Sequence, residues 1–126
     1  MATTTKRPVF LNLFEIKLPV AGIMSILHRV SGAFMFLATP LMIYLLDLSL
    51  SGEQGYAAAY ELVHGWFFVL VAFVLVWSLF HHLLAGIRFL LIDVDIGVDK
   101  PLFQQSALAV LVAAPVLAVI VTGVIL

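Results

Sequence analysis

The chain has 126 residues, of which 64% are hydrophobic and 10% charged. Soluble domains carry about 25% charged residues, so this composition indicates a membrane protein. The formal net charge of −1 gives no reason to expect a nucleic-acid partner. The chain has no cysteine, which excludes cysteine-ligated iron–sulfur clusters, covalent c-type haem and disulfides within it. Any redox cofactor would have to be held by histidine and by shape.

Residues 1–21 are predicted to form a cytoplasmic N-terminal segment. They contain a basic element, but no compact apolar stretch followed by a small-residue cleavage site, so they do not resemble a secretory signal. A short interfacial segment is expected at residues 10–14. The remaining residues, 22–126, are predicted to form one membrane anchor domain.

Three segments are long and apolar enough to cross a bilayer, for which about 20 residues are needed. They cover about 22–50, 65–92 and 105–126, and each is too long for a strand. The predicted fold class is therefore an all-α membrane protein with three transmembrane helices. Pro40 and Pro115 lie inside spans, where neighbouring helices can satisfy the freed carbonyls. Three helices with short connections offer no site for processing a polar metabolite, so we expect them to be part of a heteromeric helix bundle.

The basic residues predict the orientation of these spans. Lys6, Arg7 and Lys17 precede the first span, and Lys100 follows the second. The connection "SGEQGYAAAYELVHG" between the first two spans contains no lysine or arginine. The positive-inside rule therefore predicts a cytoplasmic N-terminus and an external C-terminus.

A first cluster of polar residues lies in "SILHRVSG", at the start of the first span. Ser25 shares a helix face with both His28 and Arg29, from which it is three and four residues away, and Ser31 follows them. A single arginine near a helix end can simply snorkel to lipid phosphates. A hydroxyl, an imidazole and a guanidinium on one face would instead offer hydrogen-bond donors to a carbonyl or a carboxylate at the membrane edge.

A second cluster lies deep in the second span, in "FHHLLAGIRFLLID". Adjacent residues on a helix point about 100° apart, so His81 and His82 cannot both bind one metal ion. A buried histidine can be a simple packing contact. Gly86, one turn from His82, would however leave room for a flat ligand such as porphyrin. His82 is roughly 15 Å above the cytoplasmic end of its helix, at 1.5 Å per residue. His28 is expected nearer the membrane edge, so a second axial ligand would come from a partner chain.

Two stretches resemble known signatures. "RPVFLNLFEIKLPVAGIMSILHRVSG" resembles the N-terminal signature of the succinate dehydrogenase cytochrome b556 subunit family, a family of membrane anchor proteins. "HLLAGIRFLLID" resembles the second signature of that family. The resemblance covers nearly the whole chain, with both motifs in the right order on the right helices. The matching residues are Arg7, Pro8, Ser25, His28, Arg29 and Ser31 in the first signature, and His82, Gly86, Arg88 and Asp93 in the second.

The resemblance implies that His82 is an axial ligand of haem b and that the other small membrane anchor subunit supplies the second histidine. It also implies a ubiquinone site near Ser25 and Arg29, with His28 and Arg29 near the haem propionates. The partners would be the iron–sulfur subunit and the flavoprotein that oxidises succinate, in the bacterial inner membrane. The expected cofactor-binding residues are Ser25, His28, Arg29, Ser31 and Arg88. One departure is Phe89, where some relatives have a second histidine.

Two other functions remain open from the sequence. A quinol:fumarate reductase anchor has the same pattern, because the sequence does not fix the direction of electron flow. A structural membrane anchor without cofactor, or a small transporter or assembly subunit, could use Arg29 and Arg88 for packing alone. His82 with Gly86, together with the Ser25, His28 and Arg29 face, favours the cofactor-binding anchor.

Overall fold

The structure is a computed structural model, and it describes residues 16–125. The Arg7–Pro8 pair, the expected interfacial segment at 10–14 and most of the expected cytoplasmic segment lie outside these residues. Within them the chain forms helices and no strand, which confirms the all-α prediction. The helices are α1 (Val20–Leu50), α2 (Glu53–His64), α3 (Trp66–Asp93) and α4 (Lys100–Ile125).

Three of the helices are long and apolar enough to cross a membrane. They are α1 with 31 residues, α3 with 28 and α4 with 26. The first two begin and end within two residues of the predicted spans. The third begins five residues before its predicted span, because the helix already includes residues 100–104, among which Lys100 and Gln104 are polar. Pro40 lies inside α1 and Pro115 inside α4, as expected.

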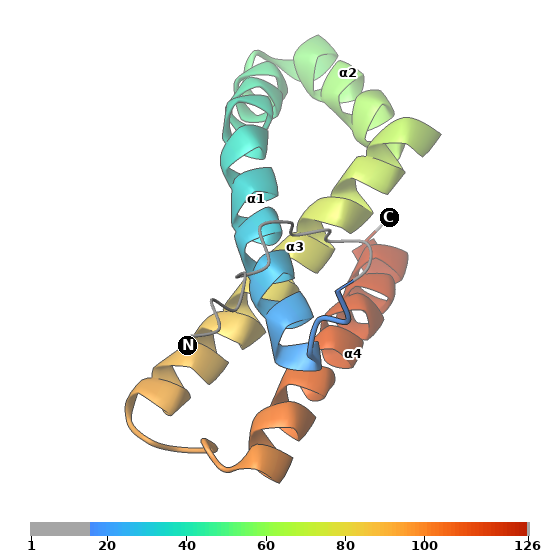
Figure 1. Cartoon of the computed structure of the whole chain (residues 1–126). Coiled ribbons are helices and arrows are strands. Elements are labelled where there is room, and N and C mark those ends of the chain that lie inside the picture. The colour runs from blue at the N-terminus through green and yellow to red at the C-terminus, as the bar shows by residue number, and fades with distance from the viewer. Residues whose placement is uncertain (1–15, 126) are drawn as a thin grey trace, which may run out of the picture.

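The connection between the first two spans is itself a helix, which was not predicted from the sequence. Helix α2 contains Ala57–Ala59, and alanine has the highest helix propensity. Gly52 before it has a φ of 117°, a conformation open mainly to glycine, so the chain can turn sharply out of α1. In Figure 1, α2 joins the ends of α1 and α3 at the top of the molecule.

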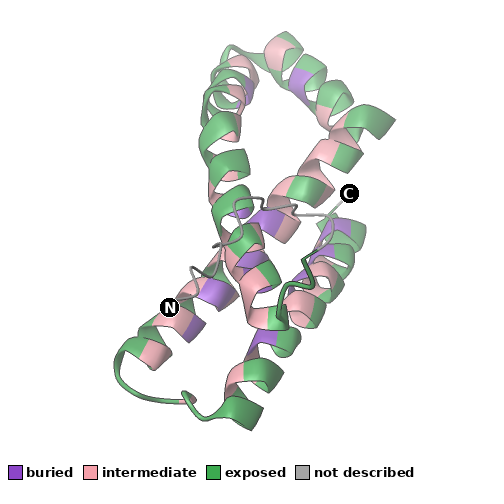
Figure 2. Ribbon diagram, in the orientation of Figure 1, coloured by how far each residue is buried: buried purple, intermediate pink, exposed green. Residues whose placement is uncertain are grey.

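The helices α1 and α3 cross, and α4 packs against both (Figure 1). The core at this crossing contains Met24 from α1, Ala85 from α3, and Ala107 and Val110 from α4. Small residues at such interfaces allow helix backbones to approach closely in a membrane. Figure 2 shows much of the buried surface where the three long helices meet.

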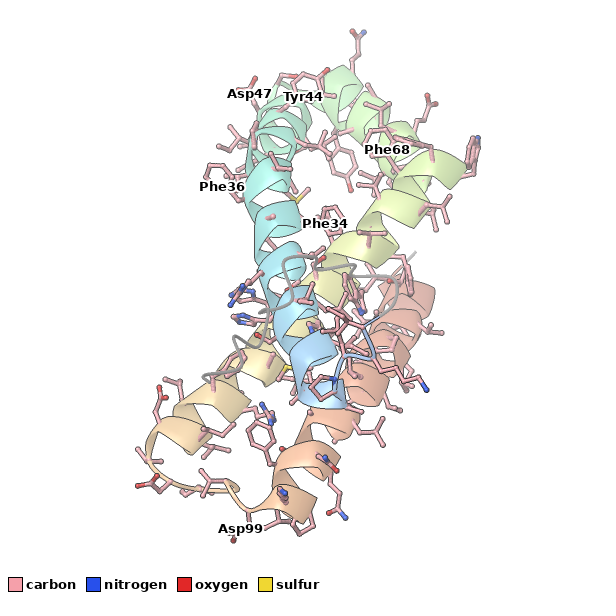
Figure 3. All side chains as sticks on the ribbon, viewed as in Figure 1. Phe34, Phe36, Tyr44, Asp47, Phe68 and Asp99 are labelled. Carbon is pink, nitrogen blue, oxygen red and sulfur yellow. The ribbon has the colours of Figure 1, made fainter. Side chains whose placement is uncertain are left out.

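Most large apolar side chains outside this core are exposed in the isolated chain. Phe36 is 77% exposed, and Figure 3 shows it pointing away from the other helices. Asp47 and Tyr44 lie near one end of the molecule and Asp99 lies at the other (Figure 3). The apolar outer surface between these ends suits a lipid or a neighbouring transmembrane helix.

Candidate functional site

The structure brings the two polar clusters of the sequence together at the α1–α3 crossing. The His28 and His82 rings stack with centroids 4.0 Å apart and planes inclined by 15°. The hydroxyl of Ser31 donates a hydrogen bond of 2.7 Å to the carbonyl oxygen of His28 and lies 3.4 Å from Nδ1 of His82. Ser31 is fully buried, and both histidines are half-buried. These three residues form the histidine cluster.

One hydrogen bond distinguishes the two ring nitrogens of His82. Nδ1 lies 3.1 Å from the carbonyl oxygen of His28, which can only accept, so Nδ1 carries the proton and donates. A neutral imidazole then has its lone pair on Nε2, which makes no hydrogen bond to the described residues. Histidines that bind metals commonly have this arrangement, with one nitrogen held by a backbone carbonyl and the other free to coordinate.

His28 was expected nearer the membrane edge than His82, and this prediction is wrong because the two rings stack. His28 is eight residues from Val20, and His82 is eleven residues from Asp93. At 1.5 Å per residue these positions are roughly 12 Å and 16 Å from the corresponding helix ends. Because α1 begins two residues before its predicted span and crosses α3, the two rings meet at one level. They still cannot ligate one iron from opposite faces, since stacked rings present their nitrogens side by side.

The missing side chain of Gly32 permits the close approach of His82 to α1. A Cβ atom at Gly32 would lie 3.0 Å from Cε1 and 3.3 Å from Nδ1 of His82, closer than side chains normally approach. A Cβ atom at Gly86 would lie 3.9 Å from Nε2 of His28, an ordinary contact. The sequence pattern pointed to Gly86 but not to Gly32. The signal for Gly32 is its position one helical turn after His28 on α1.

Phe89 also contacts the histidine cluster. Its ring meets the His28 ring edge-on, with centroids 5.2 Å apart. The residue noted as a departure from the family pattern therefore packs against His28, and the structure gives it no ring contact with His82.

Ser25 and Arg29 lie on α1 beside His28, but their side chains make no hydrogen bond among the described residues. Ser25 is half-buried and Arg29 is exposed. Ser25 precedes His28 by almost one turn, and the exposed Arg29 guanidinium is accessible to a ligand or a partner chain. Their expected roles at a quinone site are consistent with this position and remain predictions.

Arg88 lies away from the histidine cluster, against α4. Its Nε donates a 2.9 Å hydrogen bond to Ser106 Oγ, and one terminal nitrogen donates a 2.8 Å bond to the carbonyl oxygen of Phe103. The guanidinium also lies over the Phe103 ring, 4.5 Å from its centroid, and only 5% of the residue is exposed. These contacts join α3 to α4. The expected role of Arg88 in cofactor binding remains a prediction that they do not support.

His81 differs from its neighbour in being fully buried. Its Nε2 lies 3.4 Å from the carbonyl oxygen of Met24, one turn before His28 on α1. Its ring lies 5.4 Å from that of Trp77. This enclosure leaves His81 no access to a ligand, so its contacts are those of a packing residue.

The donor set of the histidine cluster fits haem better than a bare metal ion. Among the described residues no group of three or more His, Cys, Asp or Glu side chains could hold a metal. Protein-bound zinc takes three or four protein ligands. In a haem the porphyrin supplies the equatorial nitrogens, so the protein needs to provide only axial ligands. The free imidazole nitrogen of His82 can supply one of them.

An apolar groove of about 340 Å³ lies between the halves of α1 and α3 that are nearer to α2. Its lining contains no titratable or polar side chain, so it offers no redox or proton chemistry. The lining residues are Phe34, Leu37, Ala38, Leu41, Leu70, Val71, Val74 and Leu75.

Residues 3–122 match the family described as "Succinate dehydrogenase/Fumarate reductase transmembrane subunit". The chain belongs to this family. The succinate dehydrogenase cytochrome b556 subunit of Coxiella burnetii is 37% identical over 121 residues, covering 94% of this chain and 95% of the relative. The b556 subunit of Paracoccus denitrificans is 30% identical over 90% of this chain and 88% of the relative.

A third relative, the succinate dehydrogenase cytochrome b560 subunit of Reclinomonas americana, is 32% identical over 74% of this chain and 68% of the relative. The resemblance found in the sequence is thereby confirmed. Membership of the succinate dehydrogenase/fumarate reductase transmembrane subunit family, together with three apolar helices, makes this chain a multi-pass membrane protein.

Proposed function

We propose that this chain is the haem b-binding membrane anchor of succinate:ubiquinone oxidoreductase, and that His82 supplies one axial ligand. The single observation that carries the proposal is the bonding of His82. Its Nδ1 donates to the His28 carbonyl oxygen, which leaves the Nε2 lone pair free. The names of the relatives, cytochrome b556 and b560 subunits, support the assignment of the cofactor.

The second axial ligand is proposed to be a histidine of the other small anchor subunit. His28 stacks on His82 and cannot approach the opposite face of the same iron. His81 is enclosed by this chain. Haem b would therefore be shared between two subunits, with His28 and Ser31 beside it on the α1 side.

When bound, haem b accepts and releases one electron at a time. The residues of this chain orient the ligand and supply hydrogen-bond donors near it. The exposed Arg29 guanidinium suits the haem propionates or the oxygens of a reduced ubiquinone, and the Ser25 hydroxyl suits a quinone carbonyl. We propose that these two residues contribute to the ubiquinone site at the cytoplasmic side of the bacterial inner membrane.

Docking of the iron–sulfur subunit follows from the proposed orientation. A cytoplasmic N-terminus puts Arg29 and the loop between α3 and α4 on the cytoplasmic side. The iron–sulfur subunit would bind there and connect the anchor to the flavoprotein.

A quinol:fumarate reductase anchor is the second candidate, since the matched family covers both enzymes. A purely structural anchor would not need a histidine whose free nitrogen is accessible, as in His82, whereas the free nitrogen of His81 is buried.

The experiment is purification of the complex through this subunit, with identification of its chains and a dithionite-reduced minus oxidised spectrum. We expect a flavoprotein, an iron–sulfur protein and a second small membrane subunit, together with the absorption band of a reduced b-type haem. A complex of these chains without haem would support a structural anchor. Purification without a flavoprotein would overturn the proposal.

A further inference from the structure

The imidazole of His82 packs directly against the backbone of α1. The Nδ1–Cε1 edge of the imidazole lies against the backbone of α1 between His28 and Gly32. His28 provides the carbonyl oxygen at 3.1 Å, and Gly32 provides the space. An N–H···O hydrogen bond normally spans 2.7–3.2 Å, so this one is near its upper limit.

Replacement of Gly32 by any other residue would disturb this hydrogen bond. A Cβ atom 3.0 Å from Cε1 and 3.3 Å from Nδ1 would displace the imidazole edge. The ring is not the far end of a long flexible side chain, and it is confined by the stacked His28 ring. A shift of a few tenths of an ångström would lengthen the Nδ1···O distance beyond the hydrogen-bonding range.

We propose that Gly32 is a positioning residue for His82, because its missing side chain lets the His28 carbonyl hold Nδ1 and direct Nε2 outward. The inference rests on the proposed function of His82 as a haem ligand. A hydrogen bond from Nδ1–H to a carbonyl makes an imidazole a stronger electron donor to a metal at Nε2. A stronger donor stabilises ferric haem and lowers its midpoint potential.

Ser31 acts on the same carbonyl in the opposite sense. Its hydroxyl donates to the His28 carbonyl oxygen at 2.7 Å, in competition with Nδ1 of His82, while its own oxygen lies 3.4 Å from Nδ1, beyond the usual N–H···O range and therefore a weak acceptor. Removal of the hydroxyl leaves that oxygen a better acceptor for His82, and strengthens the bond that Gly32→Ala weakens. The two substitutions should therefore shift the haem potential in opposite directions.

The experiment compares Gly32→Ala and Ser31→Ala with Gly123→Ala in the purified complex. Gly123 also lies in a transmembrane helix, but a Cβ there meets nothing within 4 Å. The readouts are the haem-to-flavin ratio and the haem midpoint potential. Substitution of residues that orient a metal ligand costs on the order of 10- to 100-fold in affinity, so Gly32→Ala should lose haem. The haem that remains should have a raised potential.

Ser31→Ala should retain haem and lower its potential, and Gly123→Ala should match the wild type. Unchanged haem content and potential in Gly32→Ala, or shifts of the same sign in both variants, would overturn the inference. If the Gly32→Ala complex does not assemble, the inference is tested by Ser31→Ala alone. A lowered haem potential in that variant supports the inference, and a raised or unchanged potential overturns it. Should His82→Ala lose haem while Gly32→Ala is normal, only this inference fails. A wild-type complex without haem would overturn the proposed function as well.

Discussion

The two faces of α3 carry different polar residues, and the hydrogen-bonding groups of these residues find partners to different extents. On the α4 face, Arg88 finds three partners within the chain, namely Ser106, the Phe103 carbonyl and the Phe103 ring. On the α1 face, His82 has one nitrogen bonded and one left over. Ionisable residues inside a membrane are costly, so each needs a reason. Packing within the chain explains Arg88, whereas His82 calls for a ligand.

The adjacent histidines sharpen this difference. His81 and His82 each meet a carbonyl of α1, those of Met24 and His28, which are one turn apart. His81 is fully buried, and His82 is half-buried beside the glycines. Each ring therefore has one nitrogen without a partner among the described residues, but that nitrogen is buried in His81 (Nδ1), whereas His82 keeps Nε2 on a half-buried ring.

The largest effect is expected from a substitution on α1, Arg29→Leu, and it should be seen in quinone reduction. Arg29→Leu removes a charged donor, and hydrogen bonds to charged groups contribute about 1.5–3 kcal/mol. At about 1.4 kcal/mol per tenfold, quinone reduction should fall roughly 10- to 100-fold. Succinate oxidation with an artificial dye should persist, since we propose that this reaction occurs in the flavoprotein partner.

Ser25→Ala should impair quinone reduction less, and its matched control is Ser49→Ala, at the far end of α1. Ser49 donates to the Leu46 carbonyl within the helix and is remote from the histidine cluster. A parallel loss of quinone and dye activities would indicate an assembly defect and remove the assignment of a quinone site to this face.

A smaller effect is expected from Gly86→Ala. Within this chain the new methyl group would make only an ordinary contact with His28, so the chain should accumulate normally. If the porphyrin lies against this part of α3, the haem-to-flavin ratio should fall several-fold. Difference spectroscopy measures this haem content. A haem-to-flavin ratio equal to that of the wild type would mean that the porphyrin does not approach Gly86.

The smallest functional effect is expected on the α4 face. Arg88→Leu removes hydrogen bonds that join α3 to α4, which should destabilise the complex by about 1–3 kcal/mol. Thermal denaturation of the detergent-solubilised complex measures this loss. The haem content of the assembled complex should remain unchanged. Selective loss of haem without loss of stability would instead assign Arg88 to the cofactor.

The sequence predicted the three spans because uninterrupted apolar length determines them. It did not predict α2, whose alanines and flanking glycines are compatible with either a helix or a loop. The contacts between helices were harder still. The meeting of His28 with His82 depends on where α1 begins and how it crosses α3, and the engagement of Arg88 depends on Ser106 and Phe103 of another helix. Gly32 gains its importance only from the ring of a residue on a different helix.

The most direct measurement is the reduced-minus-oxidised spectrum of the purified complex carrying His82→Ala, beside the same complex carrying His81→Ala. Both substitutions remove one imidazole from the same turn of α3. We expect His82→Ala to lose the reduced-haem band and His81→Ala to retain it. An unchanged spectrum in His82→Ala, or loss of the band in His81→Ala alone, would contradict the assignment of His82 as the axial ligand.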